Sequence, residues 1–202
     1  MSTATSPTPS SEYPVRRPHR SEFVTLRGLR HHVLRWGPEP DGQRPLLVMV
    51  HGWMDVGASF QFMVDAFREE RSVVAIDWRG FGLTDSNGSD AYWFPDYLGD
   101  LDALLDHVSP DAPVDLVGHS MGGNVAMSYA GVRPQRIRRL VNLEGFGMPD
   151  VSPAAAPERL ARWLDELKAP PSLRPYATQA DVAERLRRNN PRLAADKAAC
   201  VA

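Results

Sequence analysis

The feature that most constrains the fold of this chain is the pentapeptide Gly-His-Ser-Met-Gly at residues 118–122. It follows the apolar run Val114–Val117 and opens a helix-like stretch. A Gly-x-Ser-x-Gly motif between a strand and a helix predicts a sharp turn that strains the serine backbone and lifts its hydroxyl above the sheet edge. Gly118 and Gly122 are needed there, because a Cβ at either place would strike neighbouring backbone. The motif therefore makes Ser120 a candidate nucleophile.

The composition limits the function classes that remain open. The chain has 202 residues, enough for one sizeable domain, and a formal net charge of -2. This charge gives no basic surface for nucleic acid or for an anionic membrane, and no apolar window approaches the length of a membrane span. The single cysteine, Cys200, excludes an internal disulfide, and no zinc-ligand pattern is present. We therefore expect no cofactor and no metal.

The first 20 residues differ in composition from the rest. They are rich in Ser, Thr and Pro and lack the apolar stretch of a secretory signal. Arg16-Arg17 is followed by Pro18 and further polar residues rather than by apolar ones, which argues against a twin-arginine signal. We predict a disordered tail and a cytoplasmic location.

Between residues 23 and 143, apolar runs and helical patterns alternate. Leu46–Val50 is continuously apolar, as expected of a strand that is buried on both faces of a parallel sheet. The clearest helix is 95–108, where apolar residues keep the i, i+3, i+4, i+7 spacing. This alternation predicts an α/β fold with a mostly parallel sheet and flanking helices. The full prediction has strands at about 23–27, 30–36, 46–50, 72–76, 114–118 and 139–143, helices at about 59–69, 95–108 and 121–132, and a surface loop at 77–91.

The pattern changes after Gly147. A Pro- and Ala-rich connection leads to amphipathic helical segments, and no further strand is predicted. In the segment 178–189, Thr178 and Asp181 are placed as a capping box. The segment before it carries an apolar stripe formed by Leu160, Trp163, Leu164 and Leu167. We therefore divide the chain into a tail at 1–20, an α/β core at 21–147 and a helical cap segment at 148–202.

Three segments, in this order, resemble those of the α/β-hydrolase superfamily, in particular its bacterial esterase-like members. They are Leu47–Trp53, which contains His51-Gly52, Asp77–Gly82, with the pattern Asp-x-Arg-Gly-x-Gly, and residues 118–123. The resemblance implies a serine hydrolase that cleaves a small apolar ester-like substrate through a covalent acyl-enzyme. A relative with Asp in place of Ser120 would dehalogenate or open epoxides, so the serine argues against both activities.

The resemblance also implies an oxyanion hole formed by the backbone N–H groups of Trp53 and Met121. Such donors stabilise the charge that develops in the transition state. It further implies that His51 orders the oxyanion loop and that the His119 side chain points away from the serine hydroxyl. The residues that support the motif are His51, Gly52, Gly118, His119 and Gly122.

The sequence offers a candidate for the acid of a catalytic triad but none for its base. Glu144 ends the last predicted strand, at the carboxyl edge where ligands bind in open α/β sheets. One possibility is that Glu144 is the triad acid, because some superfamily members place that acid here. The alternative is a carboxylate that caps a loop or lines the pocket. Asp77 and Arg79 are expected to pin their loop through each other or through backbone. No base for the serine is identified, because the histidines outside the motifs are predicted to be solvated: His19, His31, His32 and His107.

The superfamily core has eight strands, and six are predicted for this chain. The seventh and eighth strands, and the histidine that the family places after the last strand, have no counterpart, so we expect an N-terminal portion with little activity of its own. The alternatives are a catalytically incomplete fragment or binding protein with the same pocket, and a C–C bond hydrolase or cofactor-free haloperoxidase. Four residues are candidate walls of an apolar substrate pocket: Trp53, Trp163, Leu164 and Leu167. Apolar residues at helical spacing more often serve plain packing.

Overall fold

The computed structural model describes residues 13–89, 92–147, 150–169 and 175–202. It divides into two compact units, one formed by Arg17–Ala161 and a second that includes Arg162–Ala202. Most of the predicted tail, residues 1–12, lies outside the described residues. The proposed division of the chain after residues 20 and 147 stays a prediction.

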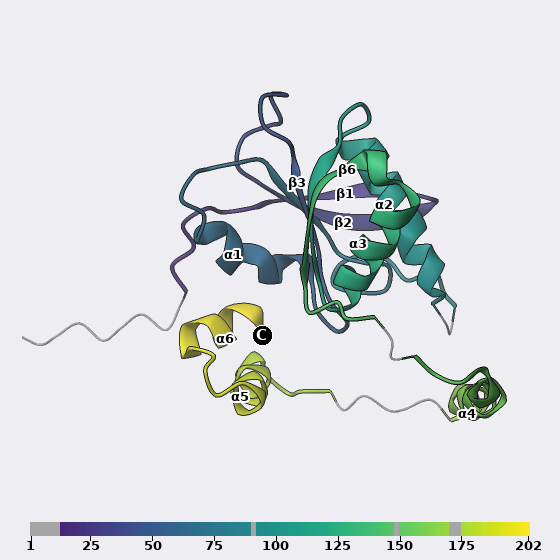
Figure 1. The fold of residues 1–202 in the computed structure, drawn as a ribbon. Coiled ribbons are helices and arrows are strands. Elements are labelled where there is room, and N and C mark those ends of the chain that lie inside the picture. The colour runs from purple at the N-terminus through teal and green to yellow at the C-terminus, as the bar shows by residue number, and fades with distance from the viewer. Residues whose placement is uncertain (1–12, 90–91, 148–149, 170–174) are drawn as a thin grey trace, which may run out of the picture. The chain divides into compact units, whose positions relative to one another are not determined.

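The first unit is built on a six-stranded sheet with the order β1-β2-β4-β3-β5-β6 (Figure 1). β1 and β2 form the predicted antiparallel hairpin, and β2 also pairs antiparallel with β4. β4, β3, β5 and β6 run parallel to one another. This arrangement confirms the predicted α/β fold with a mostly parallel sheet. The strands are β1 (Arg20–Leu26), β2 (Leu29–Trp36), β3 (Leu47–Val50), β4 (Val73–Ile76), β5 (Val114–His119) and β6 (Ile137–Leu143).

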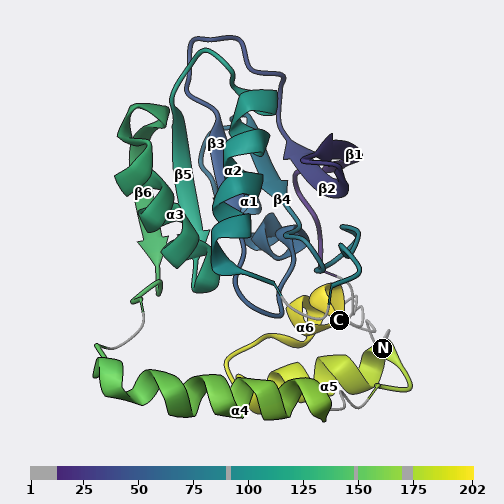
Figure 2. The same ribbon diagram turned by 90° about the vertical axis from the view of Figure 1, so that its right-hand side faces the viewer.

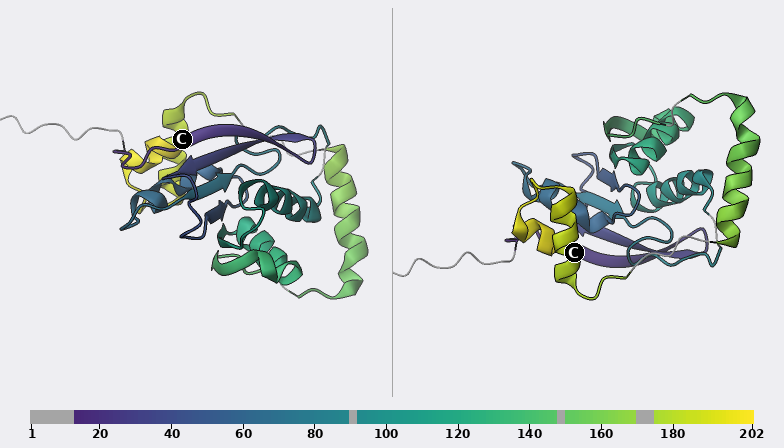
Figure 3. Two further views of the ribbon diagram at one scale, coloured as in Figure 1. Left: turned by 90° about the horizontal axis from the view of Figure 1, so that it is seen from above. Right: turned by 90° about the horizontal axis from the view of Figure 1, so that it is seen from below.

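Helices cover both faces of this sheet. α2 and α3 lie side by side on one face and α1 lies on the other (Figures 1 and 2). The views from above and below show the same pairing of α2 with α3 (Figure 3). Both helices were predicted, and Pro95 occupies the first turn of α2. The helices are α1 (Gln61–Asp65), α2 (Phe94–Val108) and α3 (Met121–Val132), with 3₁₀ turns at Gly57–Phe60 and Pro134–Arg136.

Two apolar clusters fill the space between the sheet and its helices. On the face covered by α2, Leu101 and Leu105 cluster with Val48. On the face covered by α1, Val64 clusters with Met49. Neighbouring residues of β3 thus belong to opposite clusters, as the two-residue period of a strand requires. Burial on both faces explains why β3 and β4 are continuously apolar.

The helix predicted at 59–69 is shorter than expected. α1 ends at Asp65, and Arg17 lies against this end. The Arg17 guanidinium donates hydrogen bonds of 3.0–3.1 Å to the carbonyls of Val64, Asp65 and Phe67. A cation that binds the last carbonyls stabilises a helix terminus there. The bonding partner comes from a distant segment, so local periodicity overestimated the helix length.

Two histidines that were predicted to be solvated are buried, which corrects that prediction. His31 and His32 are only 0% and 5% exposed, because β2 is an interior strand between β1 and β4. His19 and His107 are exposed, as predicted. The alternation in 30–36 correctly predicts a strand, but it does not predict that both faces of this strand are buried.

The part of the chain after β6 is helical, as predicted, and its described residues form no strand. Thr178 and Asp181 make the predicted capping box, with the Thr178 hydroxyl accepting from the Asp181 N–H. Trp163 and Leu164 are about half exposed, and their role as pocket walls stays a prediction. The helices are α4 (Ala156–Lys168), α5 (Gln179–Asn189) and α6 (Ala195–Val201), preceded by a 3₁₀ turn at Pro153–Ala155.

Candidate active site

Ser120 lies at the sharp turn between β5 and α3, in the strained conformation that the motif predicts. Its φ is 50° and its ψ is -117°, a combination that residues with a Cβ rarely adopt. The Ser120 N–H donates to the Leu143 carbonyl at 2.7 Å, and the Ser120 carbonyl accepts from the Asn124 N–H at 3.1 Å. These two bonds tie the turn to the end of β6 and to the first turn of α3.

The two glycines of the motif are required by close backbone packing, as predicted. A Cβ on Gly118 would come within 2.5 Å of the Gly122 carbonyl oxygen. A Cβ on Gly122 would strike the carbonyl oxygens of Val50 and His51. The first turn of α3 therefore packs directly on the backbone at the carboxyl end of β3.

His51 is a structural tether of the loop after β3. Its Nε2 accepts a 3.0 Å hydrogen bond from the Trp78 N–H, and its Nδ1 lies 2.8 Å from the Gly52 carbonyl oxygen. Since Nε2 accepts, the proton of the neutral ring must lie on Nδ1 and point to that carbonyl. Burial lowers the pKa of His51, which favours this neutral form. Both ring nitrogens are engaged, so His51 is not a base for Ser120.

Gly52 brings the loop after β3 against the candidate nucleophile. A Cβ on Gly52 would lie 3.0 Å from the Ser120 Cβ and 3.2 Å from the His119 Nδ1. Trp53 follows directly, is 62% exposed, and sets its ring 5.3 Å from that of Phe81. The backbone of Trp53 is thus near the nucleophile turn. That its N–H converges with the N–H of Met121 stays a prediction.

Glu144 follows β6 and lies next to the same turn. It is exposed and has a φ of 62°. The Asn142 side chain accepts from the Gly145 N–H at 2.7 Å and donates to the Gly145 carbonyl at 2.6 Å, which fixes the bend at Glu144. The Asn124 side chain accepts from the Gly147 N–H at 2.7 Å. Neither asparagine is predicted from the sequence, because a single amide in a strand or helix carries no distinguishing pattern.

Backbone strain is concentrated at this edge of the sheet. Among the described non-glycine residues, four have a positive φ. Met54, Ser120 and Glu144 follow or end the neighbouring strands β3, β5 and β6, and Arg27 lies in the β1–β2 turn. Strained residues persist where the surrounding structure holds them, and such clusters are typical of functional sites.

No histidine of the described chain hydrogen-bonds to the Ser120 hydroxyl. The His119 Nδ1 lies 3.8 Å from the Asp55 Oδ2, and Asp55 in turn accepts from Ser59 and from the Val56 N–H. The buried rings of His31, His32 and His51 and the exposed ring of His19 bond elsewhere, to the partners Leu29, Ser21, Asp77, Gly52, Trp78 and Gln61. Among the residues that the structure describes, the candidate nucleophile therefore has no hydrogen-bonded histidine base.

The loop after β4 is pinned through backbone by Asp77, as one of the two predicted alternatives has it, but Arg79 is held in another way. The Asp77 carboxylate accepts from the backbone N–H groups of Gly57 at 2.7 Å and Leu83 at 3.0 Å, as a loop pin should. Arg79 does not pair with it. Arg79 instead forms a bidentate ion pair with Asp100 of α2, with two bonds of 2.6 Å. Asp77 and Arg79 are only 2% and 6% exposed, so the start of the predicted surface loop belongs to the interior.

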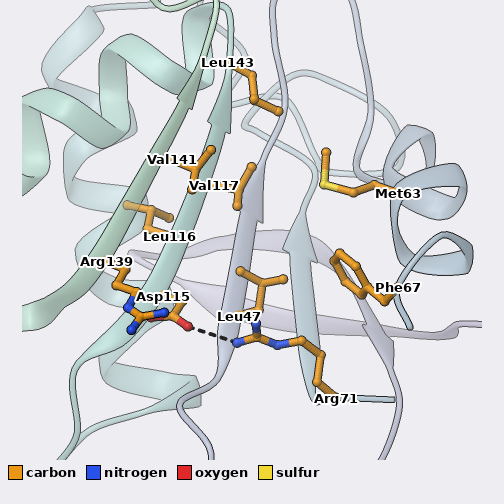
Figure 4. A pocket seen from close by; sticks show the side chains of 10 residues that line it. All are labelled: Leu47, Met63, Phe67, Arg71, Asp115, Leu116, Val117, Arg139, Val141 and Leu143. Carbon is orange, nitrogen blue, oxygen red and sulfur yellow. Dashed lines mark hydrogen bonds and ion pairs between the residues drawn. The ribbon is translucent and has the colours of Figure 1, made fainter. Parts of the chain in front are cut away.

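A separate apolar groove of about 330 Å³ lies on the α1 face of the sheet (Figure 4). Side chains from β3, β5 and β6 form its floor, and Met63 and Phe67 form one wall. An ion pair of 3.1 Å between Arg71 and Asp115 borders it. None of the predicted site residues lines this groove.

Two kinds of site are not found in the part of the chain that the structure describes. No group of three His, Cys, Asp or Glu side chains there is arranged to hold a metal ion. None of the helices in the same ranges has the length and apolar character of a membrane span.

Known proteins similar to this chain share one fold family. The sequence model of the alpha/beta hydrolase fold matches residues 45–199. The cis-3-alkyl-4-alkyloxetan-2-one decarboxylase of Shewanella oneidensis is 31% identical over 151 residues, which cover 73% of this chain and 45% of that enzyme. Epoxide hydrolase B of Mycobacterium tuberculosis is 33% identical over 123 residues, which cover 60% of this chain and 34% of that enzyme. The chain thus spans less than half the length of these relatives.

A solved structure supports the same likeness. The thioesterase domain from the curacin biosynthetic pathway matches with a TM-score of 0.79 and 26% identity. The match covers 91% of this chain and 65% of that one.

Proposed function

This chain belongs to the alpha/beta hydrolase fold family, and we propose that it carries the nucleophile half of a serine hydrolase that acts on small apolar esters or related carbonyl compounds. The observation that carries the proposal is Ser120, held at φ 50° between β5 and α3, with Gly52 packed against it. Serine at this turn favours acyl transfer over the epoxide opening named for some relatives.

The proposed reaction has two steps. The Ser120 hydroxyl attacks the substrate carbonyl, and the developing oxyanion accepts hydrogen bonds from the N–H groups of Trp53 and Met121. The leaving group departs and an acyl-serine remains, which water then hydrolyses. Met121 opens α3, where the helix dipole favours negative charge.

Ser120 and Glu144 both need a histidine to act in the proposed reaction. Glu144 stands where a triad acid would orient a histidine, and that histidine is not found among the described side chains near Ser120. A serine without a base is a weak nucleophile. We therefore propose low activity for this chain by itself. We also propose that residues 148–202 form a cap segment and that the protein is located in the cytoplasm.

A catalytically incomplete fragment or binding protein is the second candidate, and the missing base at Ser120 favours it. The two candidates differ in whether Ser120 forms an acyl adduct. Loss of triad members leaves rates about 10³–10⁴ above the uncatalysed reaction, because the oxyanion hole still acts. Slow acylation is therefore expected under the first candidate and none under the second.

The test is to incubate the purified chain with p-nitrophenyl acetate and to locate acetylated serines by mass spectrometry. We expect slow release of nitrophenol, with an acetyl group on Ser120 that is absent from the Ser120→Ala variant. No adduct on Ser120 would favour the binding protein. Rapid turnover that depends on Ser120 would show that a histidine of this chain does reach the serine, and the proposed low activity would be wrong.

A further inference from the structure

A second serine of the first unit stands in a nucleophile–base–acid arrangement. The Ser21 Oγ lies 2.6 Å from the His32 Nε2, and the His32 Nδ1 lies 2.8 Å from the Asp77 Oδ2. The three residues come from β1, from β2 and from the position directly after β4. A catalytic triad is recognised by this geometry and by the roles of its members, not by their order in the sequence.

The hydrogen-bonding pattern gives each group a defined role. The Asp77 carboxylate accepts hydrogen bonds, so the His32 Nδ1 must donate its proton to it. The His32 Nε2 is then left with a lone pair, which accepts the hydroxyl proton of Ser21. This is the tautomer in which an imidazole acts as a general base toward a serine.

The acid and the base are rigidly held. Asp77 also accepts from the backbone N–H groups of Gly57 and Leu83, and a Cβ on Gly82 would strike the Asp77 carboxylate. The Thr84 hydroxyl accepts from the His32 N–H at 2.9 Å and donates to the Asp77 carbonyl at 2.7 Å. Base and acid therefore keep their separation without a cost at the moment of reaction.

Exposure to solvent rises from the acid to the serine. Asp77 is 2% exposed and His32 is 5% exposed, whereas Ser21 is exposed on the outermost strand β1. The Phe23 ring lies 5.2 Å from the His32 ring and helps to cover it. A reagent in solution can thus reach the hydroxyl, while the hydrogen bond between His32 and Asp77 behind it is shielded from water.

We propose that Ser21 is a second, base-activated nucleophile, which reacts with small acyl and phosphoryl donors. The three residues supply a nucleophile, a base and an orienting carboxylate, but no donors for an oxyanion. The substrate class is therefore compounds with good leaving groups, such as aryl esters and fluorophosphonates.

The reaction exchanges a bond of the reagent for a bond to the Ser21 Oγ. With a fluorophosphonate, the Ser21 Oγ bonds to phosphorus, the P–F bond breaks, and fluoride leaves. The hydroxyl proton passes to the His32 Nε2 and from there to solvent. With an aryl ester, an acyl-serine forms and the phenolate takes up the proton. Water then hydrolyses the acyl-serine, with His32 as the base.

The test is labelling of the full chain with a fluorophosphonate, followed by trypsin digestion and mass spectrometry over time. Ser21 begins the peptide Ser21–Arg27. Ser72 begins the peptide Ser72–Arg79 and is the matched control, because its hydroxyl donates to the Pro38 carbonyl at 2.7 Å and not to a histidine. We expect Ser21 to be labelled about a hundredfold faster than Ser72, since general-base assistance contributes about 10²–10⁴.

Variants separate this site from the proposed active site. Labelling of Ser21 is expected to persist in Ser120→Ala and to fall to the rate of Ser72 in His32→Gln, provided that circular dichroism shows the variant to be folded. Equal rates at Ser21 and Ser72 in the unsubstituted chain would overturn the proposal, whether or not His32→Gln folds. An adduct on Ser120 alone would support the proposed function and reject the second nucleophile.

Discussion

Ser120 keeps φ at 50° although it carries a Cβ, and such a conformation costs about 1–3 kcal/mol. Neighbouring backbone offsets this cost, because the Ser120 N–H bonds to the Leu143 carbonyl and α3 packs on the end of β3. At the scale of single residues, the absence of two Cβ atoms is what permits that packing. Gly122 is the residue at which this can be measured.

Gly122→Ala is expected to destabilise the protein by about 1–3 kcal/mol, because the new methyl group would overlap with the carbonyl oxygens of Val50 and His51. Gly131→Ala is the matched control in the same helix, since nothing lies within 4 Å of its Cβ position. The control should gain about 0.5–1 kcal/mol, the usual difference between the two residues in a helix. Urea unfolding of both variants measures these free energies. Similar values for the two would show that the close approach at Gly122 is not maintained in solution.

At the scale of elements, β6 differs from the other parallel strands. It is the last strand of the described sheet, and its only neighbour there is β5. Val141 on β6 is 49% exposed and lines the apolar groove on the α1 face. An unpaired strand edge beside an apolar surface is a site at which chains associate.

Val141→Lys is therefore expected to reduce self-association of the purified chain, because a lysine places charge on the edge strand. Val132→Lys is the matched control, since Val132 is 72% exposed at the end of α3, outside the groove. Light scattering at increasing protein concentration compares the two with the unsubstituted chain. If the control reduced association as strongly, general solubility and not the β6 edge would be the cause.

At the scale of the whole first unit, Asp100 joins three separate parts. Asp100 lies on α2, and its carboxylate accepts hydrogen bonds from two arginines of other segments. They are Arg27 in the β1–β2 turn and Arg79 in the loop after β4. His31 of β2 lies 3.4 Å from the same carboxylate. Burial, the largest single influence, would by itself raise the pKa of Asp100, but the hydrogen bonds and charges of Arg79 and His31 together outweigh it and lower the pKa to about 2.

This pKa predicts how stability changes with acid. The carboxyl pKa of an unfolded chain is about 3.9, so ionised Asp100 favours the folded state above pH ~4. The contribution, about 2 kcal/mol, is lost as the pH falls through the folded value of about 2. Urea unfolding between pH ~5 and pH ~2 should show this loss. In Asp100→Asn the free energy of unfolding should be about 3–5 kcal/mol lower at neutral pH, because the buried Arg79 loses the carboxylate of its bidentate ion pair. This part of the pH dependence should then vanish.

Asp106→Asn serves as the control for that series. The Asp106 side chain is 69% exposed in its ion pair with Arg136, and an exposed pair contributes about 0–1 kcal/mol. Its unfolding free energy should follow the unsubstituted chain at every pH. A pH profile of Asp100→Asn that also followed the unsubstituted chain would mean that another carboxylate, such as Asp115, carries the acid sensitivity.

Much of the fold follows from local sequence. Some patterns extend over only a few neighbouring residues. They are the apolar runs of β3, β4 and β5, the helical period of α2 and the glycines around Ser120. Burial on both faces, one helix face or one tight turn is enough to select those residue types. The strained serine and the helical segment after β6 were predicted for the same reason.

Only the tertiary structure decided the pairing of groups that lie far apart in the chain. Arg17 ends α1, Arg79 pairs with Asp100, and His32 lies between Ser21 and Asp77. Each of these contacts depends on which strands become neighbours, and the hydrophobic pattern does not encode that order. Burial of a charged or polar side chain is favourable only when its partner is already in place. For that reason the sequence predicts the nucleophile turn, while the position of every acid and base around it is set by the folded sheet.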